Sequence, residues 1–116
     1  MENQNESKSL YKNQPGVVLR LYAKKGMGDA LFELTTKMHH TGDSDGPVDW
    51  VLCRPKDEPD TLWAFEFNKD QESFDRHYSD PVIDERHKAV FDLLDGMPLK
   101  ADIHIVSSNR TELNSI

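Results

Sequence analysis

The chain has 116 residues, of which 21 are acidic and 14 are lysine or arginine, so its formal net charge is −7. This length predicts one domain with a modest core that dimerisation would help to stabilise, and acids spread along the whole chain exclude nucleic acid and anionic membranes as the expected partners. Because Cys53 is the only cysteine and no apolar run is long enough for a membrane span or a signal peptide, we expect a cytoplasmic protein with no internal disulfide.

The first predicted elements follow a polar stretch. Residues 1–14 and 108–116 are predicted to be flexible tails, so the folded domain is expected over residues 15–107. Inside the domain, the β-rich run 17–23 predicts a strand. After the break at "KKGMGD", apolar residues at helical spacing in "ALFELTTKMHH" predict a helix that Asp29 caps or begins.

A hairpin is predicted after this helix. The run "TGDSDGP" has the composition of a loop. Residues 48–54 and 61–68 predict two strands joined by "PKDEPD". If that loop is symmetric, Trp50 faces Glu66 across the hairpin.

Two helical segments and a last strand complete the prediction. Residues 70–78 predict a short helix that Asp70 caps. A second helix is predicted to begin at "SDP" and to end before Gly96, which suits a left-handed exit. The alternating run 99–107 predicts the final strand.

This order of elements, β-α-β-β-α-β with the second helical region broken in two, predicts a ferredoxin-like α+β fold. Such a domain is a four-stranded antiparallel sheet with helices on one face. The other face of the sheet is left uncovered, so we expect the side chains on that face to decide the function.

The alternation of side chains along the strands divides them between the two faces. The bulky apolar set is expected beneath the helices and comprises Leu19, Leu21, Val51, Cys53, Trp63, Phe65, Phe67, Ile103 and Ile105. The mixed set is expected on the uncovered face and comprises Val18, Arg20, Tyr22, Trp50, Leu52, Ala64, Glu66, Asn68 and His104. Apolar walls with a few polar groups are typical of a ligand chamber and also of a dimer interface. Two sheets that face each other around a cavity would combine the two.

The middle of the chain carries a series of short motifs. They are Gly46, an Asp-rich hairpin at 57–60, "EFNKD" beginning at Glu66, Phe74 three residues before His77, and Asp80-Pro81 at the start of the next helix. In order and spacing these motifs resemble the antibiotic biosynthesis monooxygenase (ABM) domain family, which includes quinol monooxygenases and relatives of haem-degrading enzymes. The likeness covers roughly residues 16–107.

The resemblance implies a homodimer in which two ferredoxin-like sheets form an α+β barrel. It also implies a monooxygenase that oxidises a small aromatic or quinol substrate with O₂ in a pocket between sheet and helices, without metal, flavin or haem. In that chemistry the protein holds the ring, stabilises the phenolate and excludes water. Asn68 departs from the family, because many members have Trp or Tyr at this position.

The resemblance and the mixed face together suggest the site residues. The residues expected to handle protons and the substrate oxyanion are His77, Glu66, Arg20 and Tyr22. The residues expected to contact the substrate are Trp50, Leu52, Asn68, Phe74, His87 and His104. No metal ligands are expected, since the histidines lack metal-binding spacing.

Structural roles compete with several of these assignments. His77 also fits a histidine at a helix end, and His87 fits a buried structural histidine. Glu66 fits an ion pair with Arg20 across the sheet. The pair His39-His40 precedes a loop and is expected to be solvated.

Two other functions compete with an oxygenase. A non-catalytic small-molecule-binding or stress-response module would use the same chamber without chemistry, and Asn68 favours this alternative. The haem-degrading relatives have a helical histidine that lines up with His87, so haem binding is a third hypothesis. His77 stands where those relatives have Trp, which weighs against haem.

Overall fold

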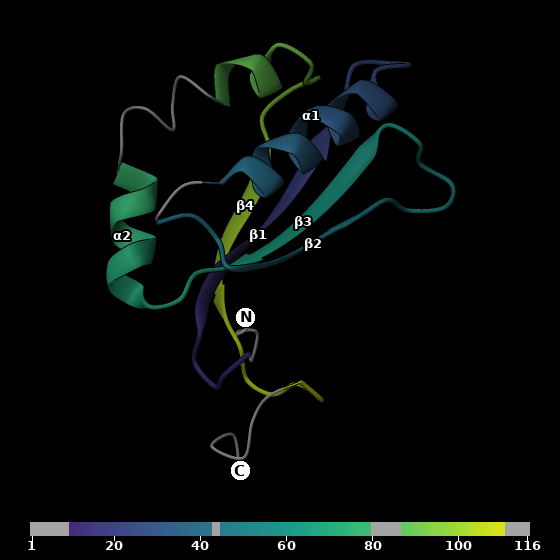
Figure 1. The fold of residues 1–116 in the computed structure, drawn as a ribbon. Coiled ribbons are helices and arrows are strands. Elements are labelled where there is room, and N and C mark those ends of the chain that lie inside the picture. Colours follow the sequence, from purple (N-terminus) through teal and green to yellow (C-terminus); the bar gives the residue numbers. More distant parts are fainter. Residues whose placement is uncertain (1–9, 43–44, 80–86, 111–116) are drawn as a thin grey trace.

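Figure 1 shows the fold in a computed structural model, which describes residues 10–42, 45–79 and 87–110. In chain order the elements are β1 (Pro15–Tyr22), α1 (Gly28–Thr41), β2 (Asp49–Cys53), β3 (Thr61–Phe67), α2 (Gln71–Ser79) and β4 (Leu99–His104). Residues 87–91 form a further short helix. Each of the six elements coincides with a predicted one, and the predicted start of the last helix lies largely outside the described residues.

The four strands form one sheet with the order β2-β3-β1-β4, in which every neighbouring pair is antiparallel. The helix α1 lies across one face of the sheet, and the short helix at 87–91 lies on the same side (Figure 1). This arrangement confirms the ferredoxin-like α+β prediction. None of the helices that the structure describes has the length and apolar character that a membrane crossing requires.

The pairing of β1 with β3 shows which side chains face the helices. Leu19 lies opposite Ala64 and Leu21 opposite Leu62. Leu21 and Leu62 belong to the buried core, and Leu19 packs against it. Because side chains alternate along a strand, Glu66 shares the helix-covered face with these residues.

The opposite, helix-free face carries the large aromatic residues of β3. Trp63, Phe65 and Phe67 lie there, and the rings of Trp63 and Phe65 are stacked with their centroids 6.4 Å apart. The prediction that these three residues pack beneath the helices is therefore wrong. The pairings of the neighbouring strands place three more residues of the predicted core set on the same face, namely Val51, Cys53 and Ile103.

The exchange of faces has a simple physical cause. The hairpin has the predicted register, with Trp50 opposite Glu66, so the error does not lie in strand pairing. Both parities of β3 carry apolar residues, and the bulkier set of Trp63, Phe65 and Phe67 predicts the core more strongly than the set that ends in Glu66. The smaller side chains of Leu62 and Ala64 are the ones buried beneath the helices, where space between sheet and helix is limited.

The core lies between the helix-covered face and the helices. Its buried members are Leu21, Ala23, Leu31, Leu62, Val90 and Leu94. Leu34 and Met38 of α1 pack against this cluster, at the spacing that predicted the helix. Complete burial of one such aliphatic side chain contributes about 1.5–3 kcal/mol. The cluster therefore holds α1 and the helix at 87–91 on one face of the sheet.

The start of α1 is capped by a residue from the hairpin. Asp29 lies in the first turn, and the N-cap residue Met27 makes no side-chain cap bond. The carboxylate of Asp60 accepts instead from the backbone N–H groups of Gly26 and Gly28, at 3.0 and 2.9 Å. A Cβ at Gly28 would lie 2.1 Å from the carbonyl oxygen of Pro59, so this approach requires glycine. The contact binds the end of the hairpin to the start of the helix.

The predicted cap of α2 is confirmed, and the predicted end of the last helix is not. The carboxylate of Asp70 accepts from the backbone N–H of Ser73 at 2.7 Å, as expected of an N-cap. The last helix ends at residue 91, earlier than the predicted end just before Gly96. Gly96 lies in the bend that follows and has a φ of +92°, the left-handed conformation that glycine adopts without steric cost.

Residues 10–14, expected to end a flexible tail, pack against the domain. The amide of Gln14 donates to the carboxylate of Asp49 and to the carbonyl of Asn68, at 3.0 Å in each case. The hydroxyl of Tyr11 donates to the carbonyl of Lys69. These bonds tie the approach to β1 to the end of β3. The rest of the predicted tails, apart from residues 108–110, lies outside the described residues.

Substitution of Asp60 by Ala is expected to lower the free energy of unfolding by about 1–2 kcal/mol, because two backbone donors at the start of α1 lose their acceptor. Urea denaturation followed by circular dichroism measures the loss. Asp57→Ala, at an exposed position of the same hairpin, is the matched control and should leave the midpoint unchanged. Equal midpoints for both variants would contradict the assigned cap.

Candidate active site

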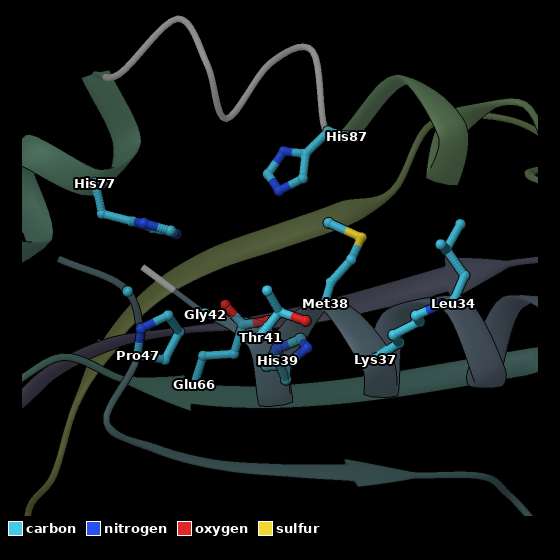
Figure 2. A pocket seen from close by; sticks show the side chains of 11 residues that line it. Leu34, Lys37, Met38, His39, Thr41, Gly42, Pro47, Glu66, His77 and His87 are labelled. Carbon is cyan, nitrogen blue, oxygen red and sulfur yellow. Dashed lines mark hydrogen bonds and ion pairs between the residues drawn. The ribbon is translucent and has the colours of Figure 1, made fainter. Parts of the chain in front are cut away.

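The site is built around a cavity of about 260 Å³ on the helix-covered face of the sheet (Figure 2). Its lining comprises Leu34, Lys37, Met38, His39 and Thr41 of α1, Gly42, Gly46 and Pro47 of the following loop, Glu66 of β3, His77 of α2, and His87. All of these residues belong to one chain. The expectation that Glu66 lies on the helix-free face is wrong, because its side chain points toward the helices and lines this cavity. The cavity lies between sheet and helices, which is where the family resemblance implies a substrate pocket.

The lining combines apolar walls with polar groups that converge. Leu34, Met38 and Pro47 provide apolar surface. Figure 2 shows the imidazoles of His77 and His87 reaching into the space above the sheet, from α2 and from the short helix. Binding sites for small organic molecules typically have this composition, in which a few polar groups orient a ligand held by apolar contacts.

Glu66 forms the floor of the cavity and is held on both carboxylate oxygens. One oxygen lies 2.7 Å from Nε2 of His39 on α1. The other accepts a hydrogen bond of 3.1 Å from the hydroxyl of Tyr78 on α2. The second ring nitrogen of His39, Nδ1, lies 2.7 Å from the carbonyl oxygen of Thr35. The carboxylate thus connects both helices to the sheet.

These contacts change the acidity of the partners. Burial by itself would lower the pKa of His39, but the hydrogen bond and charge of Glu66, with the bond to Thr35, raise the pKa of His39 above its ordinary value of 6.5. Burial and the negative charge of Glu66 raise the pKa of the Tyr78 hydroxyl far above its ordinary value. Tyr78 therefore keeps its proton and remains a donor to the carboxylate.

His39 is the site residue that sequence reasoning missed. It was expected to be solvated with His40, whereas only His40 is exposed. The spacing on α1 could have predicted its position. His39 follows Thr35 by four residues, so the two lie on the same side of the helix, and Thr35 is buried. His40 faces outward, with its ring 5.0 Å from that of Trp50.

The structure brings three of the predicted site residues together. Glu66, His77 and His87 all line the cavity. Arg20 and Tyr22 do not, because they lie on the helix-free face, where the guanidinium of Arg20 is 4.9 Å from the ring centroid of Tyr22. The expectation that these two residues share a face with Glu66 is wrong, and so is the ion pair between Arg20 and Glu66 across the sheet.

The remaining predicted contacts lie outside this cavity. The ring of Trp50 packs against that of His39, with centroids 4.9 Å apart, and Leu52 packs against the core. Phe74 and His104 line a second cavity of about 400 Å³ between α2 and the β1–β4 edge. None of these four residues lines the first cavity.

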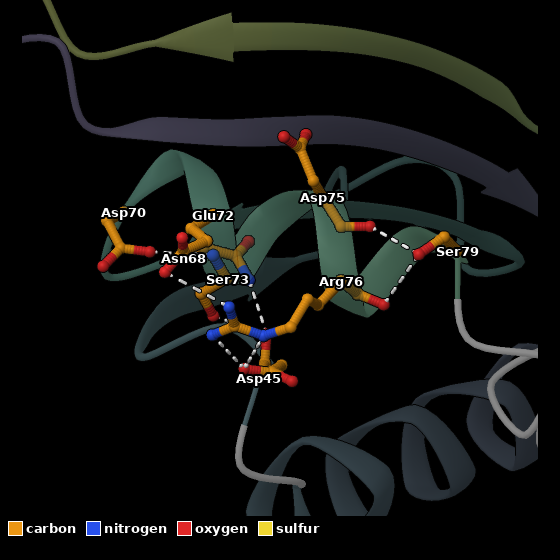
Figure 3. Close-up of polar contacts among 8 residues, drawn as sticks. All are labelled: Asp45, Asn68, Asp70, Glu72, Ser73, Asp75, Arg76 and Ser79. Atoms are coloured by element: carbon orange, nitrogen blue, oxygen red, sulfur yellow. Dashed lines mark hydrogen bonds and ion pairs between the residues drawn. The ribbon is translucent and has the colours of Figure 1, made fainter.

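Asn68 is buried and anchors a loop. Its side-chain N–H donates to the carbonyl oxygen of Asp45 at 2.8 Å, and the Ser73 hydroxyl donates to the same oxygen at 3.0 Å (Figure 3). The guanidinium of Arg76 binds the carboxylate of Asp45 at 2.8 Å. Asp45 directly precedes Gly46, which lines the cavity. Asn68 therefore positions the cavity wall and does not line the cavity.

The described residues contain no group of three or more His, Cys, Asp or Glu side chains that could hold a metal ion. His39, His77 and His87 line one cavity, but the donors are not gathered at a single point. The polar groups of the site can instead exchange protons and form hydrogen bonds with an organic ligand.

Replacement of His39 by Gln is expected to lower the free energy of unfolding by about 1–3 kcal/mol below pH 6.5, because the buried Glu66 loses a charged partner. The raised pKa of His39 means that its contribution is complete below pH 6.5 and is lost as pH rises through the higher, folded pKa. The difference between wild type and variant should therefore shrink by pH 9.

Urea unfolding at several pH values measures this dependence. His40→Gln, at the exposed neighbouring position of α1, is the matched control. A constant difference across the pH range would contradict the pairing of His39 with Glu66.

Known structures share this fold over most of the chain. A candidate antibiotic biosynthesis monooxygenase from Chloroflexus aurantiacus has 19% identity and a TM-score of 0.66, over 83% of this chain and 96% of its own. SnoaB from Streptomyces nogalater, described as a cofactor-independent oxygenase, has 17% identity and a TM-score of 0.67, over 87% and 97%. A protein of unknown function from Nitrosomonas europaea has 18% identity and a TM-score of 0.67, over 85% and 95%.

The sequence comparisons add no closer relative. No protein-family model and no curated protein sequence matches the chain. At identities below one fifth the structural likeness shows the fold alone. The predicted resemblance is confirmed at that level, and the chain has the ferredoxin-like fold of solved proteins described as candidate antibiotic biosynthesis monooxygenases.

Proposed function

We propose that the chain is a monooxygenase that oxidises a small phenol or quinol with O₂, without a bound cofactor, in the cavity between α1, α2 and β3. The observation that carries the proposal is the composition of the cavity, where His77, His87 and Glu66 meet beside the apolar Leu34 and Met38. The fold shared with SnoaB, described as a cofactor-independent oxygenase, supports the same reaction class.

The reaction requires a site that makes the ring electron-rich and keeps water away. For a simple phenol, one atom of O₂ becomes a carbonyl oxygen on the ring. The other atom leaves as water with the hydroxyl hydrogen and one ring hydrogen, and the substrate supplies the four electrons. Loss of the hydroxyl proton comes first, because a phenolate gives an electron to O₂ more readily than a phenol. Preorganised donors that stabilise the oxyanion then lower the barrier.

Each wall of the cavity would have a part in this chemistry. The apolar residues Leu34, Met38 and Pro47 would hold the ring and exclude bulk water. The imidazoles of His77 and His87 would donate hydrogen bonds to the substrate oxygens. The size of the cavity, about 260 Å³, lies at the lower end for organic ligands and favours a small aromatic molecule.

We also propose that two copies pair through the helix-free face. Most of the described side chains on this face are apolar, and they come from all four strands: Val18, Tyr22, Val51, Trp63, Phe65, Phe67, Leu99 and Ile103. The charged residues Arg20 and Asp49 also lie on this face, and the guanidinium of Arg20 packs over the rings of Tyr22 and Trp63. Val51 and Leu99 each leave more than half of their surface exposed. A contiguous exposed apolar face of this kind is typical of a protein interface. The cavity lies on the other face of the sheet, so pairing would leave it open.

A binding module without chemistry is the second candidate. Asn68 favours it, because it stands where many ABM proteins have Trp or Tyr and because its side chain holds Asp45 and does not enter the cavity. Such a protein would bind phenols without consuming O₂. Ligand-induced shifts of the melting temperature with no oxygen uptake would identify it.

Oxygen uptake with a panel of naphthols, anthrones and quinols tests the first candidate. His77→Gln is expected to lower kcat/KM about tenfold, because loss of one hydrogen bond to a buried oxyanion costs about 1.4 kcal/mol. His104→Gln, which changes a histidine outside the cavity, should keep wild-type activity. No uptake by the wild type with any member of the panel would refute an oxygenase.

Native mass spectrometry and sedimentation test the dimer. Val51→Lys is expected to yield monomers, because it places a charge within the apolar helix-free face. Met97→Lys is the matched control, because Met97 is also an exposed apolar residue but lies in the turn before β4. A monomeric wild type at micromolar concentration would contradict the proposed pairing.

A further inference from the structure

We propose that His39 and Glu66 act together as the group that accepts the substrate proton at the floor of the cavity. This inference rests on the function proposed above and identifies the base that the reaction needs. Both residues line the cavity, and they come from α1 and β3. His77 and His87 then have the separate task of holding the substrate oxygens.

The geometry of His39 shows where its protons lie. A backbone carbonyl oxygen can only accept a hydrogen bond, so Nδ1, at 2.7 Å from the oxygen of Thr35, must carry a proton. The 2.7 Å contact between Nε2 and the Glu66 oxygen also needs a proton between the two atoms. That second proton is the one that the pair shares, whether it is assigned to the imidazole or to the carboxylate.

Loss of the shared proton makes the pair a base. If Nδ1 keeps its proton, the lone pair of Nε2 faces a carboxylate oxygen at 2.7 Å. If the remaining proton moves to Nε2, the lone pair of Nδ1 faces the Thr35 oxygen at the same distance. One of the two contacts becomes repulsive in either case. Uptake of a proton from the substrate restores both hydrogen bonds, which is a driving force that an isolated carboxylate lacks.

Tyr78 keeps the carboxylate in place while the proton moves. Its hydroxyl donates to the other oxygen of Glu66 at 3.1 Å. Its ring packs against that of Phe74, with centroids 4.7 Å apart, and the ammonium of Lys100 lies 4.8 Å from the ring centroid. These contacts position the tyrosine, so the oxygen that faces His39 has little freedom to turn away.

The charged surroundings of the pair come from several elements. Lys37 of α1, His77 of α2 and His87 line the same cavity. Lys100 and Asp102 of β4 act on the Tyr78 side. The rings of His39 and His40 both pack against that of Trp50, with centroid distances of 4.9 and 5.0 Å. The groups that line the cavity with the pair are neutral or positive, which favours the phenolate that remains.

The step itself is a proton transfer without any change of oxidation state. The O–H bond of the substrate breaks, its electron pair stays on oxygen, and the proton is bound between Nε2 of His39 and the Glu66 carboxylate. The products are a phenolate and the same proton-sharing pair that the structure contains. The phenolate is then the electron donor in the proposed oxidation.

The first test measures the protonation of His39 in the free protein, without substrate. Imidazole ¹⁵N shifts are followed by NMR against pH in the wild type, in Glu66→Gln and in Tyr78→Phe. We expect His39 to keep a proton on Nδ1 and to lose the shared proton only above pH 6.5, and we expect Glu66→Gln to shift this titration downward. Titration at or below pH 6.5, or a titration that Glu66→Gln leaves in place, would overturn the inference.

The second test measures proton transfer from a bound phenol to the pair of His39 and Glu66, in the absence of O₂. The ionisation of 4-nitrophenol bound to the protein is followed by its absorbance under anaerobic conditions. The bound phenol should ionise at a pH about one unit lower in the wild type than in His39→Gln, a tenfold shift in the equilibrium, because the proton that leaves it is held between His39 and Glu66. His40→Gln, at the exposed neighbour, should behave as the wild type. Unchanged ionisation in His39→Gln would overturn the inference.

The two tests separate this inference from the proposed function. Ionisation of bound nitrophenol that depends on His39, with no oxygen uptake by any quinol, would support the proton acceptor and refute the oxygenase. Oxygen uptake that persists in a folded His39→Gln variant at the wild-type rate and with the wild-type pH profile would refute the proton acceptor and support the oxygenase. Circular dichroism of each variant establishes that it is folded.

Discussion

The arrangement of the site depends on one buried carboxylate. Glu66 lies on the helix-covered face of β3, where a charge without partners would cost several kcal/mol. His39 from α1 and Tyr78 from α2 satisfy its two oxygens, so the three elements meet at one point. The space that remains among them is the cavity of Figure 2. The group that is costly to bury thereby becomes the group around which the cavity is built.

A second set of polar contacts shapes the wall of that cavity. Asn68 and Ser73 bind the carbonyl of Asp45, and Arg76 binds its carboxylate (Figure 3). The loop that follows α1 is thus fastened to the end of β3 and to α2. The amide of Asn68, which the family resemblance singled out as a departure, is therefore engaged in holding this loop.

Some of the predicted site residues line the cavity, and others lie on the opposite face of the sheet. Glu66, His77 and His87 follow from the family resemblance, Glu66 also from strand parity, and all three line one cavity. Arg20 and Tyr22 came from strand parity and lie on the opposite face. Parity correctly groups residues within one strand, but it does not state which group the helices cover. His39 was missed because its partner Glu66 is 27 residues away and belongs to another element.

The order of strands and helices, the hairpin register and the Asp70 cap were determined by the sequence alone, because each depends on contacts between residues close in the chain or on simple alternation. Only the tertiary structure decided which face of the sheet the helices cover, and with it the place of the cavity. Both parities of β3 carry apolar residues, so the choice depended on the volume available beneath α1. That space accepts Leu62 and Ala64 and leaves Trp63 and Phe65 on the open face.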